Sequence, residues 1–145
     1  MALLVDPQSE PFFAGLRGGE LLIQHCAKCD GYQSQVPRRT NGTAACRSCG
    51  TTGPDWVPAQ GEGVVISWTT TAFGHREGKA GGARRLAGIV ELAEGPWLFA
   101  ELDASKAPVE VGTAVVLSIA NRSELGMPVP VFVPQRPAAG VSDVR

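Results

Sequence analysis

The sequence predicts a mainly β protein: a short N-terminal helix, then a small module built on four cysteines, then a five-stranded barrel. Three observations lead to this fold class. The four cysteines of the 145-residue chain form two Cys-x-x-Cys pairs, and five short runs of β-branched and aromatic residues follow them. Glycine (18 residues) and proline (11) are abundant, which favours short strands joined by turns over long helices.

The N-terminal segment, residues 1–19, is expected to be a loose arm followed by a short helix. Ser9 is placed to cap this helix, with Pro11 in the first turn, where a missing N–H is tolerated. Apolar residues at helical spacing are Phe12, Phe13 and Leu16. Because two helical turns are marginal on their own, these side chains either pack against the rest of the chain or dock on a partner.

The two cysteine pairs, Cys26 with Cys29 and Cys46 with Cys49, are separated by sixteen residues, and each is closely followed by glycine. Two such turns can present four thiolates to one tetrahedral ion, as in structural zinc sites. Disulfides are the alternative, but residues 1–10 lack a secretory signal pattern, so we expect a reducing, cytoplasmic location. A redox role would need one pair, and four thiolates leave no open position for catalytic zinc.

Residues 20–58 are expected to form the zinc ribbon around these cysteines. Residues 20–25 read as a strand that leads into the first pair. The finger between the pairs contains a turn signal at Asn41-Gly42. Trp56 follows the second pair and is a large apolar residue that could seal the joint to the next domain.

Residues 59–135 are expected to form a barrel, and residues 136–145 a flexible tail. The predicted strands lie at residues 64–71, 85–92, 97–102, 114–119 and 129–133. The Glu94-Gly95-Pro96 turn joins the second and third strands as a hairpin, and Pro130 indicates an edge or an irregular start for the fifth. Five short strands in about 75 residues suit a small Greek-key barrel such as the OB-fold.

Six motifs follow one another in a specific order along residues 10–135. The N-terminal module contains Phe-Phe-x-Gly-Leu-Arg-x-Gly-Glu-Leu before the first cysteine pair, Val-Pro-Arg in the finger and Cys-x-x-Cys-Gly at the second pair. The barrel region contains Gly-x-Val-x-Ser-Trp-Thr, Val-Glu-Leu-x-Glu-Gly and a closing Pro-Val-Phe. In this order they resemble the DUF35 family of OB-fold, acyl-CoA-associated zinc-ribbon proteins. The finger is a few residues longer than the family pattern. The resemblance implies a rubredoxin-like zinc ribbon joined to an OB-fold.

The resemblance also implies a partner protein. DUF35 proteins work beside thiolase-like enzymes, among them acyltransferases, side-chain-cleaving aldolases of steroid degradation and hydroxymethylglutaryl-CoA synthases. In these complexes the thiolase-like subunit carries the catalytic residues. The chain is therefore expected to be a non-catalytic accessory subunit of a hetero-oligomer that supports assembly and the acyl-CoA site. Its cofactor would be structural Zn²⁺, with CoA or acyl-CoA as a shared ligand.

A glycine-rich loop at residues 75–85 carries four Lys or Arg residues and one Glu. Arginine forks suit the phosphates of CoA, and basic residues also suit an acidic partner surface. The candidate contacts are Lys79, Arg84 and Arg85 in this loop and Arg38 and Arg39 in the finger. A solvated loop without a ligand is the alternative.

No catalytic residue is predicted in this chain. It has no Gly-x-Ser-x-Gly motif and no phosphate-binding loop, and all four cysteines are assigned to zinc. The two histidines, His25 and His75, are interpreted as polar positions, and three carboxylates of the barrel are expected to be exposed charges: Glu91, Glu94 and Glu101. A free-standing enzyme that uses some other residue remains a minor alternative.

A nucleic-acid-binding module is the main alternative function, because zinc ribbons and OB-folds both occur in such proteins. A formal net charge of -1 argues against a strongly basic binder, although a local patch could still bind. No stretch approaches the roughly 18 apolar residues of a membrane span, so no membrane partner is expected.

Overall fold

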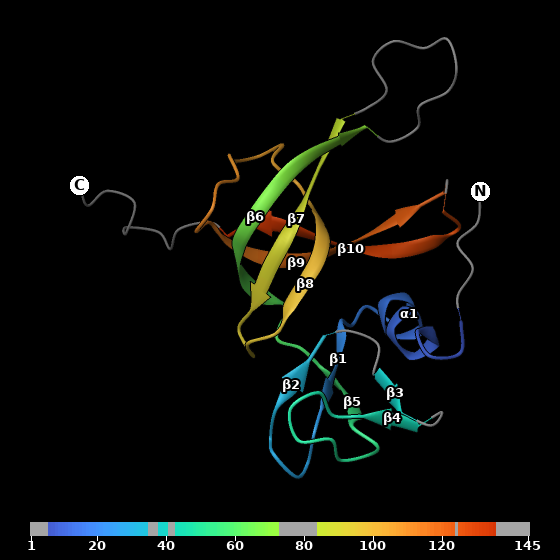
Figure 1. Cartoon of the computed structure of the whole chain (residues 1–145). Helices are drawn as coiled ribbons and strands as arrows, with labels where there is room; N and C mark the ends of the chain where they lie inside the picture. Colours follow the sequence, from blue (N-terminus) through green and yellow to red (C-terminus); the bar gives the residue numbers. More distant parts are fainter. Residues whose placement is uncertain (1–5, 35–37, 41–42, 73–83, 124, 136–145) are drawn as a thin grey trace.

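The computed structural model describes residues 6–34, 38–40, 43–72, 84–123 and 125–135, with the backbone alone for 38–40, 43, 72 and 84. The elements in these residues are α1 (Glu10–Arg17), β1 (Leu22–His25), β2 (Tyr32–Gln33), β3 (Arg38–Thr40), β4 (Thr43–Ala45), β5 (Asp55–Pro58), β6 (Glu62–Ala72), β7 (Arg84–Leu92), β8 (Trp97–Leu102), β9 (Ala114–Arg122) and β10 (Met127–Pro134). Figure 1 shows α1 and the first five strands gathered at one end of a barrel made by the last five.

The helix α1 begins differently from the expectation. The side chain of Ser9 does not cap the helix, so that prediction is wrong. Asp6 lies three residues earlier and accepts the backbone N–H groups of Gln8 and Ser9 at 2.8 and 2.9 Å through its Oδ1 atom. The Ser9 hydroxyl instead donates to the Asp6 carbonyl, because a turn that starts at Asp6 already holds it there.

The N-terminal strands form two small sheets. β1 lies between β2 and β5 and is antiparallel to both, which confirms a strand leading into the first cysteine pair. β3 and β4 pair antiparallel beside it. The predicted turn at Asn41-Gly42 falls between these two strands and lies outside the described residues.

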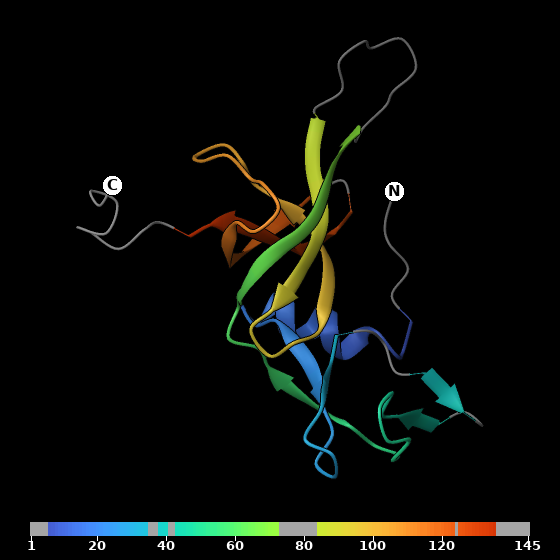
Figure 2. The same cartoon turned by 60° about the vertical axis from the view of Figure 1, so that its left-hand side comes forward.

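The barrel contains all five strands predicted from the sequence, in the order β10-β8-β7-β6-β9. Strands consecutive in sequence pair antiparallel from β6 to β8 and from β9 to β10, whereas β10 and β8 pair parallel and close the barrel. The result is the mixed, five-stranded arrangement of an OB-like barrel, seen from a second side in Figure 2.

The seam between β8 and β10 is short. Its residue pairs are Val131 with Glu101 and Phe132 with Leu102. The Phe132 carbonyl accepts the N–H of Asp103 across this seam at 2.9 Å. Alternate residues of a strand face the same side, so Pro130 directs its nitrogen toward β8 just before the first residue pair of the seam. Pro130 thus lies at an unpaired edge, as predicted, but it does not mark an irregular start, because β10 begins at Met127 and pairs regularly with β9.

The barrel and the N-terminal elements share one hydrophobic core. Phe132 and Val65 fill the barrel, while Leu16 of α1 and Ile23 of β1 belong to the same buried cluster. The N-terminal module is thus anchored to the barrel by apolar packing. In the part of the chain that the structure describes, no helix is long and apolar enough to cross a membrane.

Candidate metal centre and apolar groove

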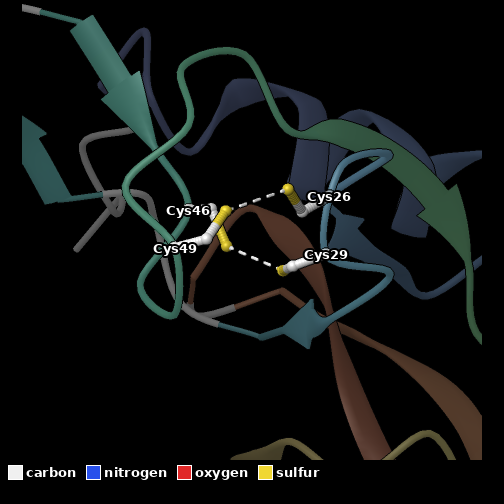
Figure 3. A group of neighbouring side chains, drawn as sticks. All are labelled: Cys26, Cys29, Cys46 and Cys49. Atoms are coloured by element: carbon white, nitrogen blue, oxygen red, sulfur yellow. Dashed lines mark hydrogen bonds between the residues drawn. The ribbon is translucent and has the colours of Figure 1, made fainter.

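The four cysteines converge in the N-terminal module, with all Sγ atoms within 4.8 Å of one another (Figure 3). Cys26 Sγ lies 3.7 Å from Cys49 Sγ, and Cys29 Sγ lies 3.6 Å from Cys46 Sγ. A tetrahedral zinc ion with Zn–S bonds of about 2.3 Å separates its sulfurs by about 3.8 Å. The cysteines are free rather than disulfide-bonded, and their spacing fits such an ion.

Both cysteine turns have the same backbone hydrogen bonds, which explains why they present their sulfurs alike. In the first, the N–H of Cys26 donates to the carbonyl of Gly31 at 2.9 Å. In the second, the N–H of Cys46 donates to the carbonyl of Thr51 at 2.8 Å. Each turn therefore closes five residues after its first cysteine, and the two turns face each other across the sulfur cluster.

The residue after each second cysteine has a left-handed backbone. Gly50 takes this conformation in the second turn with φ 78°, as glycine does readily. Asp30 takes it in the first turn with φ 63°, and aspartate is among the few other residues that tolerate it. The Asp30 carboxylate lies 2.5 Å from His25 Nε2, so that histidine is held by Asp30 at the rim of the cluster.

Hydrogen bonds to the sulfurs favour thiolates in the second turn. The Thr51 hydroxyl, 3.2 Å from Cys49 Sγ, and then the Thr51 N–H lower the pKa of Cys49 to about 6. The backbone N–H groups of Cys49 and Ser48 lower the pKa of Cys46. The Gly31 N–H also lowers the pKa of Cys29, but the neighbouring Cys46 sulfur and desolvation outweigh it and raise that pKa to about 12. Four adjacent sulfurs do not all ionise unless a cation is present, which is the behaviour expected of a metal site.

A buried glutamine pair links the two cysteine turns. Gln33 Nε2 of β2 donates to Gln24 Oε1 of β1 at 2.7 Å, and Gln33 Oε1 accepts the backbone N–H of Arg47 at 2.8 Å. Both glutamines are buried, so each bond compensates a polar group that has lost water. Gln33 thus ties the strand beside the first turn to the backbone inside the second turn.

We expect Gln33→Ala to weaken zinc binding by about 10- to 100-fold, because it frees the backbone that orients Cys46 and Cys49. Competition with a chromophoric chelator would measure this change. Gln60→Ala is the matched control, since the Gln60 side chain is exposed. Equal zinc affinity in both variants would contradict a positioning role for Gln33.

The basic residues predicted to meet CoA or a partner are only partly described. Arg38 and Arg39 lie in β3 and Arg84 begins β7, but their side chains lie outside the described residues, as does Lys79 altogether. The Arg85 side chain is described and lies with its Nε 3.8 Å from Glu101 Oε1. No two of these basic side chains are therefore brought together in the described part of the chain.

Glu101 was expected to be an exposed charge, and that prediction is wrong. It is half-buried and forms an ion pair with Arg122 Nη2 as well as with Arg85. The pairing arises because β10 brings the β9 strand and its Arg122 close to β8 at the barrel seam. Glu91 and Glu94 also have partners: Glu91 accepts the indole N–H of Trp97 at 2.9 Å, and Glu94 accepts the N–H of Gln60 at 2.7 Å.

Next to this ion pair runs a groove of about 720 Å³, which we call the apolar groove. Its walls are α1, β8 with the adjoining part of β7, Trp56 of β5, and the start of β10. The apolar residues that line it are Phe12, Phe13, Trp56, Ala87, Leu98, Phe99, Ala100, Leu125, Val129 and Pro130, and its polar or charged residues are Ser9, Ser34, Arg85 and Glu101.

The three apolar residues of the N-terminal helix pack against the rest of the chain, one of the two uses predicted for them, and docking on a partner stays a prediction. Leu16 is 2% exposed and packs in the core, so it is unavailable for docking. Phe12 and Phe13 are half-buried and line the groove, with their rings edge-to-face at 5.3 Å between centroids. This groove is not among the features predicted from the sequence. Its signal is the run Trp97-Leu98-Phe99-Ala100, which is apolar on both faces of a strand.

Comparison with known proteins gives three findings. A family model described as the C-terminal OB-fold domain of ChsH2 matches residues 56–120. A chain of a solved structure described as the Ltp2-ChsH2(DUF35) aldolase is 27% identical, with a TM-score of 0.69, over 91% of this chain and 98% of that chain. A Sulfolobus solfataricus protein of unknown function from the DUF35 family is 19% identical, with a TM-score of 0.58, over 90% of this chain and 87% of that chain, and this likeness shows the fold alone. Among curated proteins, none matches.

The family model and the aldolase chain agree with each other and with the observed fold of a cysteine module joined to an OB-like barrel. The matched domain runs from β5 of the N-terminal sheet to β9 of the barrel, and the aldolase chain matches almost end to end, with the cysteine module included in the length. The motif order along the sequence indicates the same family. The chain is therefore similar to OB-fold proteins of the DUF35 family along nearly its whole length.

Proposed function

We propose that this chain is a non-catalytic, zinc-containing accessory subunit of an aldolase complex whose partner is a thiolase-like enzyme acting on an acyl-CoA. The observation that carries the proposal is the likeness to a chain of the Ltp2-ChsH2(DUF35) aldolase along nearly the whole of both chains. A likeness that spans both modules supports a shared role better than a match of one domain would, since OB-folds alone serve many functions.

In this proposal the metal is structural. Four thiolates satisfy a tetrahedral zinc ion, and when bound it would cross-link the two cysteine turns without offering a coordination position to substrate. Leu21 and Ile23 connect the cross-linked module to the barrel, because both side chains are fully buried in the common core. The metal would thereby hold α1 and the module in one orientation against the barrel.

The carboxylates support a non-catalytic role. Retro-aldol cleavage needs a base that takes the proton of the hydroxyl group while the carbon–carbon bond breaks. Glu101 is held between two arginines, so this carboxylate is already engaged. Glu91 is engaged by the Trp97 indole. Bond cleavage is therefore assigned to the partner, and assembly and support of the acyl-CoA site to this chain.

Contact with the CoA phosphates is proposed for Lys79, Arg84 and Arg85, and contact with the partner for Arg38 and Arg39. Arginine is suited to this role because its planar fork matches phosphate oxygens. Arg85 would have to exchange its ion pair with Glu101 for a phosphate. A reducing compartment, such as the cytoplasm, would keep the cysteines available for zinc.

Co-expression with the Ltp2-like subunit of the same organism tests the proposal. We expect a stable complex on size exclusion, and retro-aldol cleavage of a β-hydroxyacyl-CoA by the complex at least about 100-fold faster than by either subunit, because neither alone holds a complete site. Failure to form a complex, or full activity of the partner alone, would overturn it. Salt-dependent binding of a single-stranded oligonucleotide would favour the nucleic-acid alternative instead.

A further inference from the structure

Strand β8 has one paired edge and one edge that is largely open. β7 pairs with it along its full length, from Glu91 opposite Trp97 to Leu86 opposite Leu102. On the other side, the described pairing with β10 begins at Glu101. Residues 97–100 therefore form a strand edge with which no other described strand pairs, and this edge borders the apolar groove.

The direction of the backbone groups on this edge follows from two hydrogen bonds. The Trp97 carbonyl accepts the Ser34 hydroxyl, and the Asp103 N–H donates across the seam to Phe132. Odd-numbered residues of β8 thus turn their backbone groups away from β7, because alternate residues of a strand face the same side. The N–H and the carbonyl of Phe99 consequently face the groove.

Proteins normally protect such an edge with charges, proline or a covering element. Residues 97–100 contain no charge and no proline. The Phe99 side chain is 69% exposed and that of Trp97 is 53% exposed. An aromatic strand edge that the described strands leave unpaired, beside an apolar groove, is the arrangement expected where another protein segment completes the sheet.

We propose that an extended, apolar segment of the partner subunit lies in the groove and pairs with the backbone of Phe99 as an added strand of the barrel. The proposal rests on the proposed function in that the partner is the aldolase subunit. The open edge of four residues is about 13 Å long, which fits a segment of about four residues. The paired backbone gives this segment its register, and Phe12, Phe13 and Pro130 provide apolar walls for its side chains.

Amide hydrogen exchange tests the pairing directly. In the free chain, we expect the Phe99 amide to exchange fast and the Leu98 and Ala100 amides slowly, since those two face β7. In the complex with the Ltp2-like subunit, we expect exchange at Phe99 to slow by at least about 100-fold, as for a hydrogen bond in a stable sheet. A Phe99 amide that is already protected in the free chain would overturn the proposal in favour of a second copy or another segment of this chain.

Two substitutions at one position separate the backbone from the ring. Phe99→Ala removes the ring and keeps the N–H, whereas Phe99→Pro removes both without breaking a β7 bond. We expect Phe99→Pro to bind the partner about tenfold more weakly than Phe99→Ala, as the loss of one hydrogen bond implies. Equal binding by the two variants would overturn the pairing. If Phe99→Pro does not fold, the exchange measurement on the native chain decides.

The outcomes also separate this inference from the function on which it rests. A complex that is active but leaves the Phe99 amide fast-exchanging refutes the added strand and leaves the accessory role intact. Protection of Phe99 together with equal partner binding by Phe99→Ala and Phe99→Pro would show that a side chain covers the edge without pairing, and it would also refute the strand. No complex at all overturns both.

Discussion

Replacement of Cys46 by alanine is expected to abolish stoichiometric zinc binding and to unfold the cysteine module. Three thiolates cannot complete a tetrahedral shell, and the binding free energy of a structural zinc ion, about 10–16 kcal/mol, is folding free energy for such a module. We expect the metal content to fall from about one ion per chain to nearly none, and the melting temperature to fall by at least about 10 °C. Elemental analysis and thermal unfolding would measure both.

Ser48→Ala is the matched control for this substitution. Ser48 lies in the same turn, and its backbone N–H, which the variant keeps, donates to Cys46 Sγ at 3.4 Å. We expect this variant to retain zinc and to melt as the native chain does. Native zinc content and melting in Cys46→Ala would refute the four-cysteine site.

The fold could be predicted from the sequence where the pattern itself determines the structure. Two Cys-x-x-Cys pairs leave few arrangements other than a shared cluster, and β-branched runs such as that in β6 form strands in most contexts. The edge position predicted for Pro130 also held, because the missing N–H restricts proline to an unpaired direction. In each case the residue types restrict the backbone or the ligands within a few residues of their own position, so a local pattern is enough to predict the structure.

The features that could not be predicted depend on residues far apart in the sequence. Glu101 is half-buried because Arg122 reaches it from β9, twenty-one residues later. The apolar groove forms only where α1, β8 and β10 come together in the fold, and no short sequence pattern predicts how these three elements are arranged. Ser9 failed as a cap for a different reason: it has a helical backbone, with φ -93° and ψ -9°, and its hydroxyl donates to the Asp6 carbonyl instead of accepting from the first turn of the helix.

Replacement of Phe132 by alanine is expected to destabilise the barrel by about 3–5 kcal/mol, the usual cost of removing a buried phenylalanine. Phe132 is 0% exposed and belongs to one of the two residue pairs that close the barrel between β8 and β10. Its loss leaves a cavity beside the short seam. We expect the melting temperature to fall by roughly 8–15 °C, measured by circular dichroism on the zinc-loaded chain.

Phe99→Ala makes the same chemical change on the neighbouring strand and is the matched control. Because the Phe99 side chain is 69% exposed, we expect it to alter stability by less than about 1 kcal/mol. A large loss of stability in this variant, or none in Phe132→Ala, would contradict the assignment of core and surface around the seam. If the two differ as expected, the aromatic ring of Phe99 does not serve to stabilise the isolated chain. The exposed ring of Phe99 is then expected to contact another molecule, which agrees with the open edge of β8 being a binding surface.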